Sequence, residues 1–88
     1  MNFKFRTISK DLPYFVLQIC DHSSKVITSY IVSSKNYTFF AAPSEPYLEV
    51  LYDLINDKQI ELIEKCKNVV GDDTYTCKLT PKLILAIL

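Results

Sequence analysis

Glycine is scarce in this chain: Gly71 is the only one among 88 residues. Phosphate-binding loops, dinucleotide fingerprints and nucleophile elbows each need several closely spaced glycines, because the backbone there turns sharply or approaches a ligand. None of these motifs occurs intact. The sequence therefore predicts a protein without such machinery, and we expect no enzyme activity and no cofactor.

Histidine and cysteine are too few for a recognisable metal or nucleophile site. His22 is the sole histidine, and Cys20, Cys66 and Cys77 have no paired spacing. Cys20 and His22 would share a face of a strand. Two ligands do not close a tetrahedral zinc site, however, and a Cys–His nucleophile pair needs a third, orienting group. We expect no metal site, and a small Cys/His-dependent enzyme is the least favoured alternative.

Long apolar runs are also missing. Lys4 and Arg6 interrupt the first apolar residues, so no signal peptide is expected, and the apolar run at the C-terminus has six residues. A bilayer-spanning helix needs about 20. An odd number of cysteines without paired spacing is typical of a reducing compartment. We expect an intracellular protein, cytoplasmic or nuclear, with no membrane association.

What the chain does have is apolar residues. They make up 49% of the sequence, and 12% of the sequence is aromatic. A domain of this length buries only about 60% of its unfolded surface. The composition therefore provides a core and leaves apolar surface that a free monomer cannot fully hide. We predict a single α+β domain over residues 1–88.

Alternating patterns predict strands at both ends of the chain. Residues 2–8 place Phe3 and Phe5 on one face and Lys4 and Arg6 on the other, whereas residues 14–20 are apolar on both faces, as in a central strand. The remaining strands are expected at residues 26–32, 37–42 and 74–80. We expect the strand at residues 74–80 to pair within the same sheet. One candidate position for it is the sheet edge beside residues 2–8.

A helical pattern runs through residues 44–68. Ser44 is a suitable N-cap, and Leu48, Leu51 and Ile55 follow at helical spacing, but Ile60 is out of phase. We expect one bent helix, or two helices re-phased near residue 57, with Gly71 as the C-terminal stop. The predicted fold is an antiparallel sheet of four to five strands in β-β-β-β-α-β order. The bent or broken helix covers one face of it, and a short apolar element follows.

Acidic residues recur every four positions in this segment: Glu45, Glu49, Asp53, Asp57 and Glu61. Like charges at this spacing destabilise an isolated helix by about 0.2–0.5 kcal/mol per pair. One interpretation is a solvated outer face, and the other is a docking stripe for a basic partner. The first 44 residues carry five cations against two acids. A weakly basic sheet facing the acidic helix would therefore balance both charges.

The chain ends in LILAIL. Thr80 as N-cap and Pro81 at the first helical position would start a short helix there, and a strand is the alternative. Either this segment packs into the core or it inserts into a partner. Its candidate partner contacts are Leu83, Ile84, Leu85, Ile87 and Leu88.

We therefore expect a non-enzymatic protein-interaction module, such as a small subunit or an assembly or regulatory factor, that binds another protein or itself. The alternative is a single-stranded RNA binder that uses rings near cations, namely Phe3, Phe5, Tyr14, Phe15, Phe39 and Phe40. A net charge of zero disfavours it. Residues 36–55, in which a strand leads through two prolines into a helix, resemble part of the small proteasome-assembly chaperones. No site residue is carried over from that resemblance.

Overall fold

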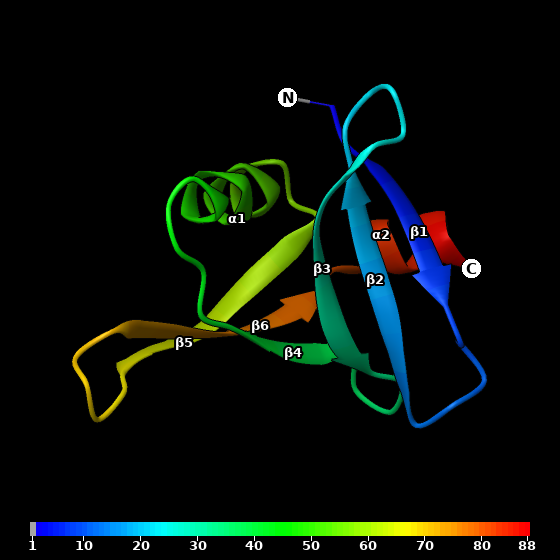
Figure 1. The fold of residues 1–88 in the computed structure, drawn as a ribbon. Helices are drawn as coiled ribbons and strands as arrows, with labels where there is room; N and C mark the ends of the chain where they lie inside the picture. Colours follow the sequence, from blue (N-terminus) through cyan, green and yellow to red (C-terminus); the bar gives the residue numbers. More distant parts are fainter. Residues whose placement is uncertain (1) are drawn as a thin grey trace.

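The computed structural model describes residues 2–88, which form two antiparallel three-stranded sheets and two helices in one α+β domain (Figure 1). Sheet A has the order β1-β2-β3 and sheet B the order β4-β6-β5. The elements are β1 (Lys4–Ile8), β2 (Tyr14–Cys20), β3 (Val26–Ser33), β4 (Thr38–Ala41), α1 (Tyr47–Asn56), β5 (Ile60–Lys67), β6 (Asp73–Leu79) and α2 (Pro81–Ile87).

Sheet A follows its sequence pattern. β2, apolar on both faces, is the central strand, as predicted. β1 exposes Lys4 and Arg6 and half-buries Phe5. The register pairs Phe5 with Ile19 and Leu17 with Tyr30, so the inward-facing side chains of the three strands form one apolar layer.

The predicted single sheet of four to five strands is not what forms. β4 leaves sheet A and pairs with β6 instead. The chain reverses after β3 through Tyr37, which has a positive φ of 58°, and the Phe39 ring then stacks on Tyr30 at a centroid distance of 4.5 Å. This contact holds β4 against β3 through side chains, without a backbone ladder, so a second sheet begins. β6 lies between β4 and β5 and not beside β1.

The predicted long helix is also wrong in its second half. α1 ends at Asn56, Lys58 follows with a φ of 62°, and the chain continues as β5. Ile60, out of phase for a helix, begins that strand and is buried. The IELIEK run fits a period of two as well as one of 3.6, and the pairing with β6 decides between them.

Three smaller expectations about turns and caps can be compared with the structure. The N-cap of α1 is Pro46 without a side-chain bond, and Ser44 contributes only its carbonyl, which accepts from Leu48 N at 3.1 Å. Gly71 turns the β5–β6 hairpin with a φ of 87° and does not end a helix. Thr80, in contrast, does cap α2, accepting from Leu83 N at 3.4 Å, with Pro81 at the first helical position.

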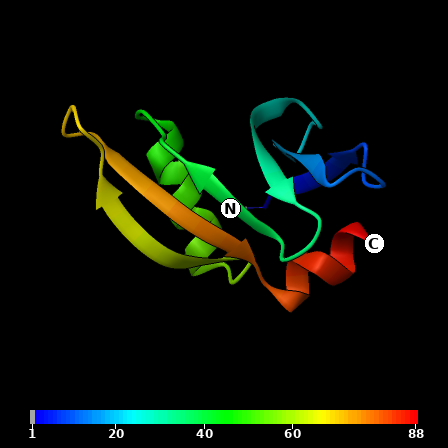
Figure 2. The same cartoon turned by 90° about the horizontal axis from the view of Figure 1, so that it is seen from below.

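The core lies between the inner faces of the two sheets and is completed by both helices. α1 packs against sheet B and α2 contacts β1 and β6, as Figure 2 shows from below. The fully buried side chains come from every layer: Leu17, Ile19 and Val32 of sheet A, Phe39, Cys77 and Leu79 of sheet B, Leu51 and Leu54 of α1, and Leu83 of α2. Both helices therefore lie on the inner side, and the outer face of each sheet has no helix over it.

Candidate interaction surface

The five acidic residues predicted as a docking stripe lie on different elements of the chain. Glu49 and Asp53 lie on α1, Glu45 precedes it, and Glu61 is on β5 opposite Lys78. Asp57 caps the C-terminus of α1, where it accepts from Gln59 Nε2 at 3.1 Å and approaches Lys82 Nζ at 4.0 Å. Residues four apart lie on one face only within a helix, and α1 ends at Asn56, so the spacing does not define a face beyond that residue.

The cationic half of the chain does not neutralise these acids. Lys4 and Arg6 point outward from sheet A, away from the inner side on which α1 lies. The ion pairs within residues 2–88 join other groups: Lys65 and Lys67 to Asp73, and Lys82 to Asp57. Lys67 and Lys65 also lower the pKa of Asp73. Within residues 2–88, no ion pair therefore joins the predicted basic sheet to the predicted acidic stripe.

The C-terminal run divides between the core and the surface. Leu83 is fully buried, and Ile84 and Ile87 pack against the core from its edge. Leu85 and Leu88 are about three-quarters exposed, at 74% and 75%. The end of α2 is fixed beside β1, since Lys10 Nζ donates to the carbonyl of Ile87 at 2.5 Å (Figure 1).

Cys20 and His22 are not brought together as a reactive pair. Cys20 is buried, whereas His22 is exposed in the turn after β2. That turn is organised by Asp21, whose Oδ1 accepts from the backbone N–H groups of Ser23 and Lys25, both at 2.9 Å. Bonds to Ser23 and Lys25 lower the pKa of Asp21. Within residues 2–88 no three His, Cys, Asp or Glu side chains are grouped to hold a metal ion.

The outer face of sheet A carries an exposed apolar row across all three strands. The register pairs Ile8 of β1 with Val16 of β2, and Val16 with Ile31 of β3. Ile8 is 47% exposed and Ile31 69% exposed, while Val16 between them is half-buried. Tyr14, two residues before Val16, adds an exposed ring on the same face. An uncovered apolar row of this kind is a feature of surfaces that bind partners.

The rest of this face is basic or neutral. The next row pairs Arg6 with Gln18 and Gln18 with Ser29, and Lys4 lies opposite Cys20. None of the sheet A residues that point outward on these strands is acidic. The outer face of sheet A, which we define as Lys4, Arg6, Ile8, Tyr14, Val16, Gln18, Ser29 and Ile31, therefore combines an apolar row with two positive charges.

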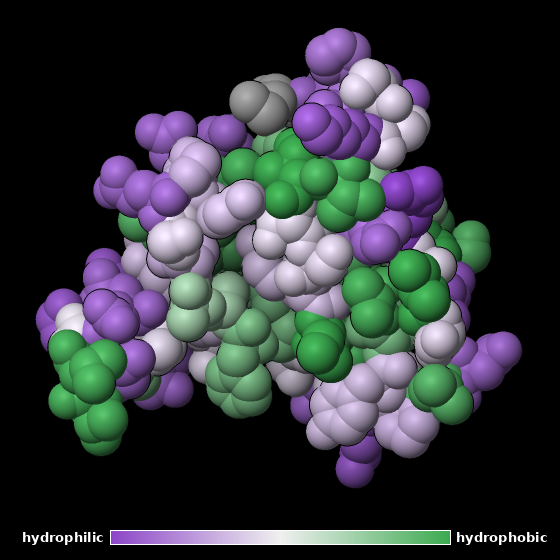
Figure 3. Space-filling view, viewed as in Figure 1, coloured by the Kyte–Doolittle hydropathy of each residue, from purple (hydrophilic) through white to green (hydrophobic). Residues whose placement is uncertain are grey.

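Exposed apolar residues also occur away from this face. Phe40 of β4 is 81% exposed on the outer face of sheet B, and Val69 and Val70 project from the tip of the β5–β6 hairpin. Figure 3 shows hydrophobic surface over the central strands and, separately, at the hairpin tip. Phe40 lies on a different element from the Val69–Val70 pair, whereas the row on sheet A runs through three paired strands.

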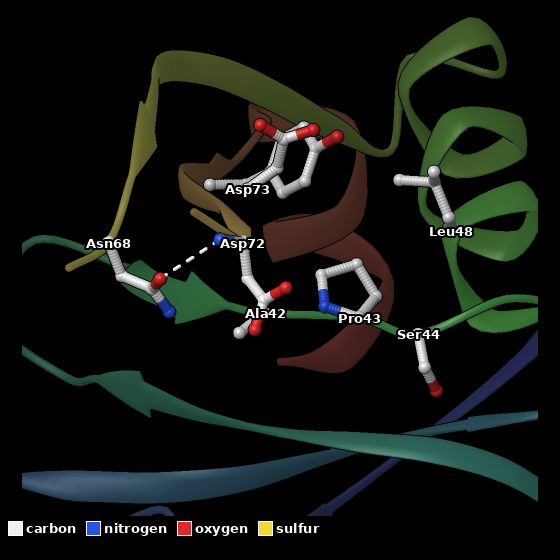
Figure 4. A pocket seen from close by; sticks show the side chains of 8 residues that line it. Ala42, Pro43, Ser44, Leu48, Asn68, Asp72 and Asp73 are labelled. Carbon is white, nitrogen blue, oxygen red and sulfur yellow. Dashed lines mark hydrogen bonds between the residues drawn. The ribbon is translucent and has the colours of Figure 1, made fainter. Parts of the chain in front are cut away.

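Two hollows flank residues 42–44, which connect β4 to α1. The β3–β4 hollow, of about 280 Å³, lies between residues 28–30 of β3 and residues 40–44, with Tyr47 at its side. The acidic hollow, also of about 280 Å³, is lined by residues 42–44, Leu48, Asn68, Asp72, Asp73 and Tyr75. Figure 4 shows the Asn68 side-chain oxygen accepting from the backbone N–H of Asp72 at 3.0 Å, which fixes the hairpin wall of this hollow.

The rings proposed for base stacking are mostly used in packing. Phe15 and Phe39 are buried, and Phe3 and Phe5 lie against the core. The two exposed rings, Tyr14 and Phe40, belong to different sheets. The structure therefore does not assemble a stacking platform from these six residues.

The sequence analysis did not identify the outer face of sheet A, although the sequence contains part of the pattern that forms it. Ile8 continues the outward phase of Lys4 and Arg6 within one strand. Its alignment with Val16 and Ile31 depends on the register of three strands, which a single sequence does not determine.

No family model, curated protein or solved structure matches this chain. Within residues 2–88, neither helix is both long and apolar enough to cross a membrane.

Proposed function

We propose that this chain is a non-enzymatic protein-interaction module, a small subunit or assembly factor, which binds a partner through the outer face of sheet A. The observation that carries the proposal is the exposed row of Ile8, Val16 and Ile31. A strand position on the solvent side of a sheet is normally polar, and these three apolar residues occupy paired positions on adjacent strands.

The charges on this face suggest the chemistry of the partner. Lys4 and Arg6 lie next to the apolar row, and no outward-facing strand residue on the sheet is acidic. A partner that buries Ile8 and Ile31 would bring its own rim close to these cations. We therefore favour a partner surface with apolar residues at its centre and Asp or Glu at its edge.

The experiment compares the proteins that co-purify with wild type and with an Ile31→Lys variant from the cells that make the chain. Ile31 is 69% exposed, so the substitution leaves the core intact, and a thermal melt verifies this. The matched control is Val69→Lys, which adds the same charge at an exposed valine of the hairpin tip. The proposal predicts proteins that wild type and Val69→Lys retain and Ile31→Lys loses. Identical sets from all three proteins would refute it.

A single-stranded nucleic-acid binder is the second candidate, supported by Lys4, Arg6 and Tyr14 on the same face. Such binding falls steeply with salt, because each neutralised phosphate releases counterions. Titration with a fluorescent oligouridylate at low and high salt tests this candidate. Affinity that falls with salt and with Lys4→Ala/Arg6→Ala supports it, and absence of binding at low salt removes it.

A further inference from the structure

The open edge of β3 differs from the other strand edges of the molecule. β3 is eight residues long and pairs with β2 on one side only. Its sequence, VITSYIVS, contains no charged residue, proline or glycine. One bulge interrupts its pairing with β2, where Ile19 pairs with Thr28 and Cys20 with Val26. Exposed edges in natural sheets are usually protected by charges, bulges or short length, because unpaired backbone groups otherwise recruit another strand.

The other edge strands have this protection. β5 carries four charged residues, Glu61, Glu64, Lys65 and Lys67, and has a bulge between Leu62 and Glu64. β1 carries Lys4 and Arg6, and β4 has only four residues. β3 alone among the edge strands of residues 2–88 combines length with a neutral, β-branched sequence.

The space beside this edge is open at the β3–β4 hollow, next to the point where Phe39 of β4 stacks on Tyr30. The β3–β4 hollow separates residues 28–30 from residues 40–42, so two strands that belong to different sheets face each other without a ladder between them. The hollow is lined by exposed Phe40 and Tyr47 together with small side chains and hydroxyl groups. A backbone edge next to pockets for alternate side chains is the arrangement that strand addition uses.

The charge near the β3–β4 hollow favours extended segments that carry a Lys or Arg. The acidic hollow adjoins it across residues 42–44 and contains Asp72 and Asp73, and no Lys or Arg lines either hollow. Asp73 is already paired with Lys67 at 3.0 Å, whereas Asp72 takes part in none of the ion pairs of residues 2–88. A cation that reaches over Pro43 would therefore find Asp72 without a competing partner.

We infer that the β3–β4 hollow binds an extended segment of another protein, which adds as a strand to the open edge of β3 and places a Lys or Arg at Asp72. This surface shares Ser29 with the outer face of sheet A but otherwise uses the edge of β3 and the connection to α1.

The test uses phage-displayed random octapeptides selected on the full chain, followed by amide hydrogen exchange with one enriched peptide bound. Every second N–H of β3 points to the open side and exchanges fast in the free protein. The inference predicts enriched peptides that contain Lys or Arg and slow these amides at least tenfold. It also predicts that Asp72→Asn weakens binding by about two- to fivefold, as for an exposed ion pair.

The control variant is Ile8→Lys, which alters the outer face on β1 and leaves this peptide response unchanged. If no peptide is enriched, or if the bound peptide protects β5 or leaves the β3 amides unprotected, the inference is wrong. If the proposed function were wrong instead, Ile31→Lys would leave partner binding unchanged, while the peptide would still protect the β3 amides.

Discussion

Replacing Tyr30 by phenylalanine should stabilise this protein. Tyr30 is 7% exposed, its ring stacks on Phe39 with 25° between the planes, and its hydroxyl is buried without a hydrogen-bond partner in residues 2–88. Burial also raises the pKa of this hydroxyl to about 12. A buried polar group without a partner costs about 1–3 kcal/mol relative to its hydrated state in the unfolded chain. Phenylalanine removes that cost and keeps the stacked ring.

The gain is smaller than the full desolvation cost, because the substitution also loses the van der Waals contacts of one oxygen atom. We therefore expect the free energy of unfolding to rise by about 1 kcal/mol. For a domain of this size, about 1 kcal/mol corresponds to a melting temperature higher by roughly 4–8 °C. Urea denaturation followed by circular dichroism, with an unchanged m-value, measures the change.

Tyr75→Phe is the matched control. Tyr75 is also buried, but its hydroxyl is not among the buried groups of residues 2–88 left without a partner, and the neighbouring Tyr52 raises the pKa of Tyr75 to about 12. Removing this hydroxyl relieves no unsatisfied buried group, so Tyr75→Phe should be neutral or destabilising. If Tyr30→Phe destabilised the protein by 1 kcal/mol or more, the Tyr30 hydroxyl would have a partner and the reasoning would be wrong.

Three further predictions concern alkaline pH, α2 and its cap. Burial raises the pKa of Cys77 from 9.0 to about 11 and that of Tyr30 from 10.0 to about 12, so the unfolded chain ionises first and stability should fall as pH rises from about 9 to 12. Tyr30→Phe should flatten the loss above pH 10, and equal slopes in urea melts of both proteins would contradict this. Leu83→Ala should lower the free energy of unfolding by about 2–5 kcal/mol in urea melts, because Leu83 is fully buried. The exposed control Leu85→Ala should change it by no more than about 0.5 kcal/mol. Equal effects of the two substitutions would mean that α2 does not dock as described. Thr80→Ala should cost about 1 kcal/mol through loss of the cap, and a melting temperature equal to that of wild type would show that the cap contributes nothing.

Sequence patterns identified the strands of sheet A well. In β1 the pleat alone places Phe5 and Lys4 on opposite faces, and the apolar run of β2 marks the central strand. The cap of α2 was equally predictable, since Thr80 and Pro81 act within one turn of the chain. These features are set by residues close together in the chain, so they can be predicted from one sequence.

The errors arose where pairing and packing between elements decide the structure. The IELIEK run supports a helix or a strand, and pairing with β6, which follows it in the chain, makes it β5. The split into two sheets depends on Tyr30 stacking on Phe39 across a turn. The row of Ile8, Val16 and Ile31 exists only in the register of three strands. Local propensity contains no information on any of these contacts.

The most direct test of the proposed interaction module is photo-crosslinking in the cells that make the chain. A benzophenone amino acid is placed at position 31 on the outer face of sheet A, and at position 69 on the hairpin tip in a control. Both native residues, Ile31 and Val69, are exposed and apolar, so the comparison separates a specific surface from general hydrophobicity. The account predicts one adduct of defined mass from position 31 and none from position 69. Equal adducts from both positions, or an adduct from position 69 alone, would contradict it.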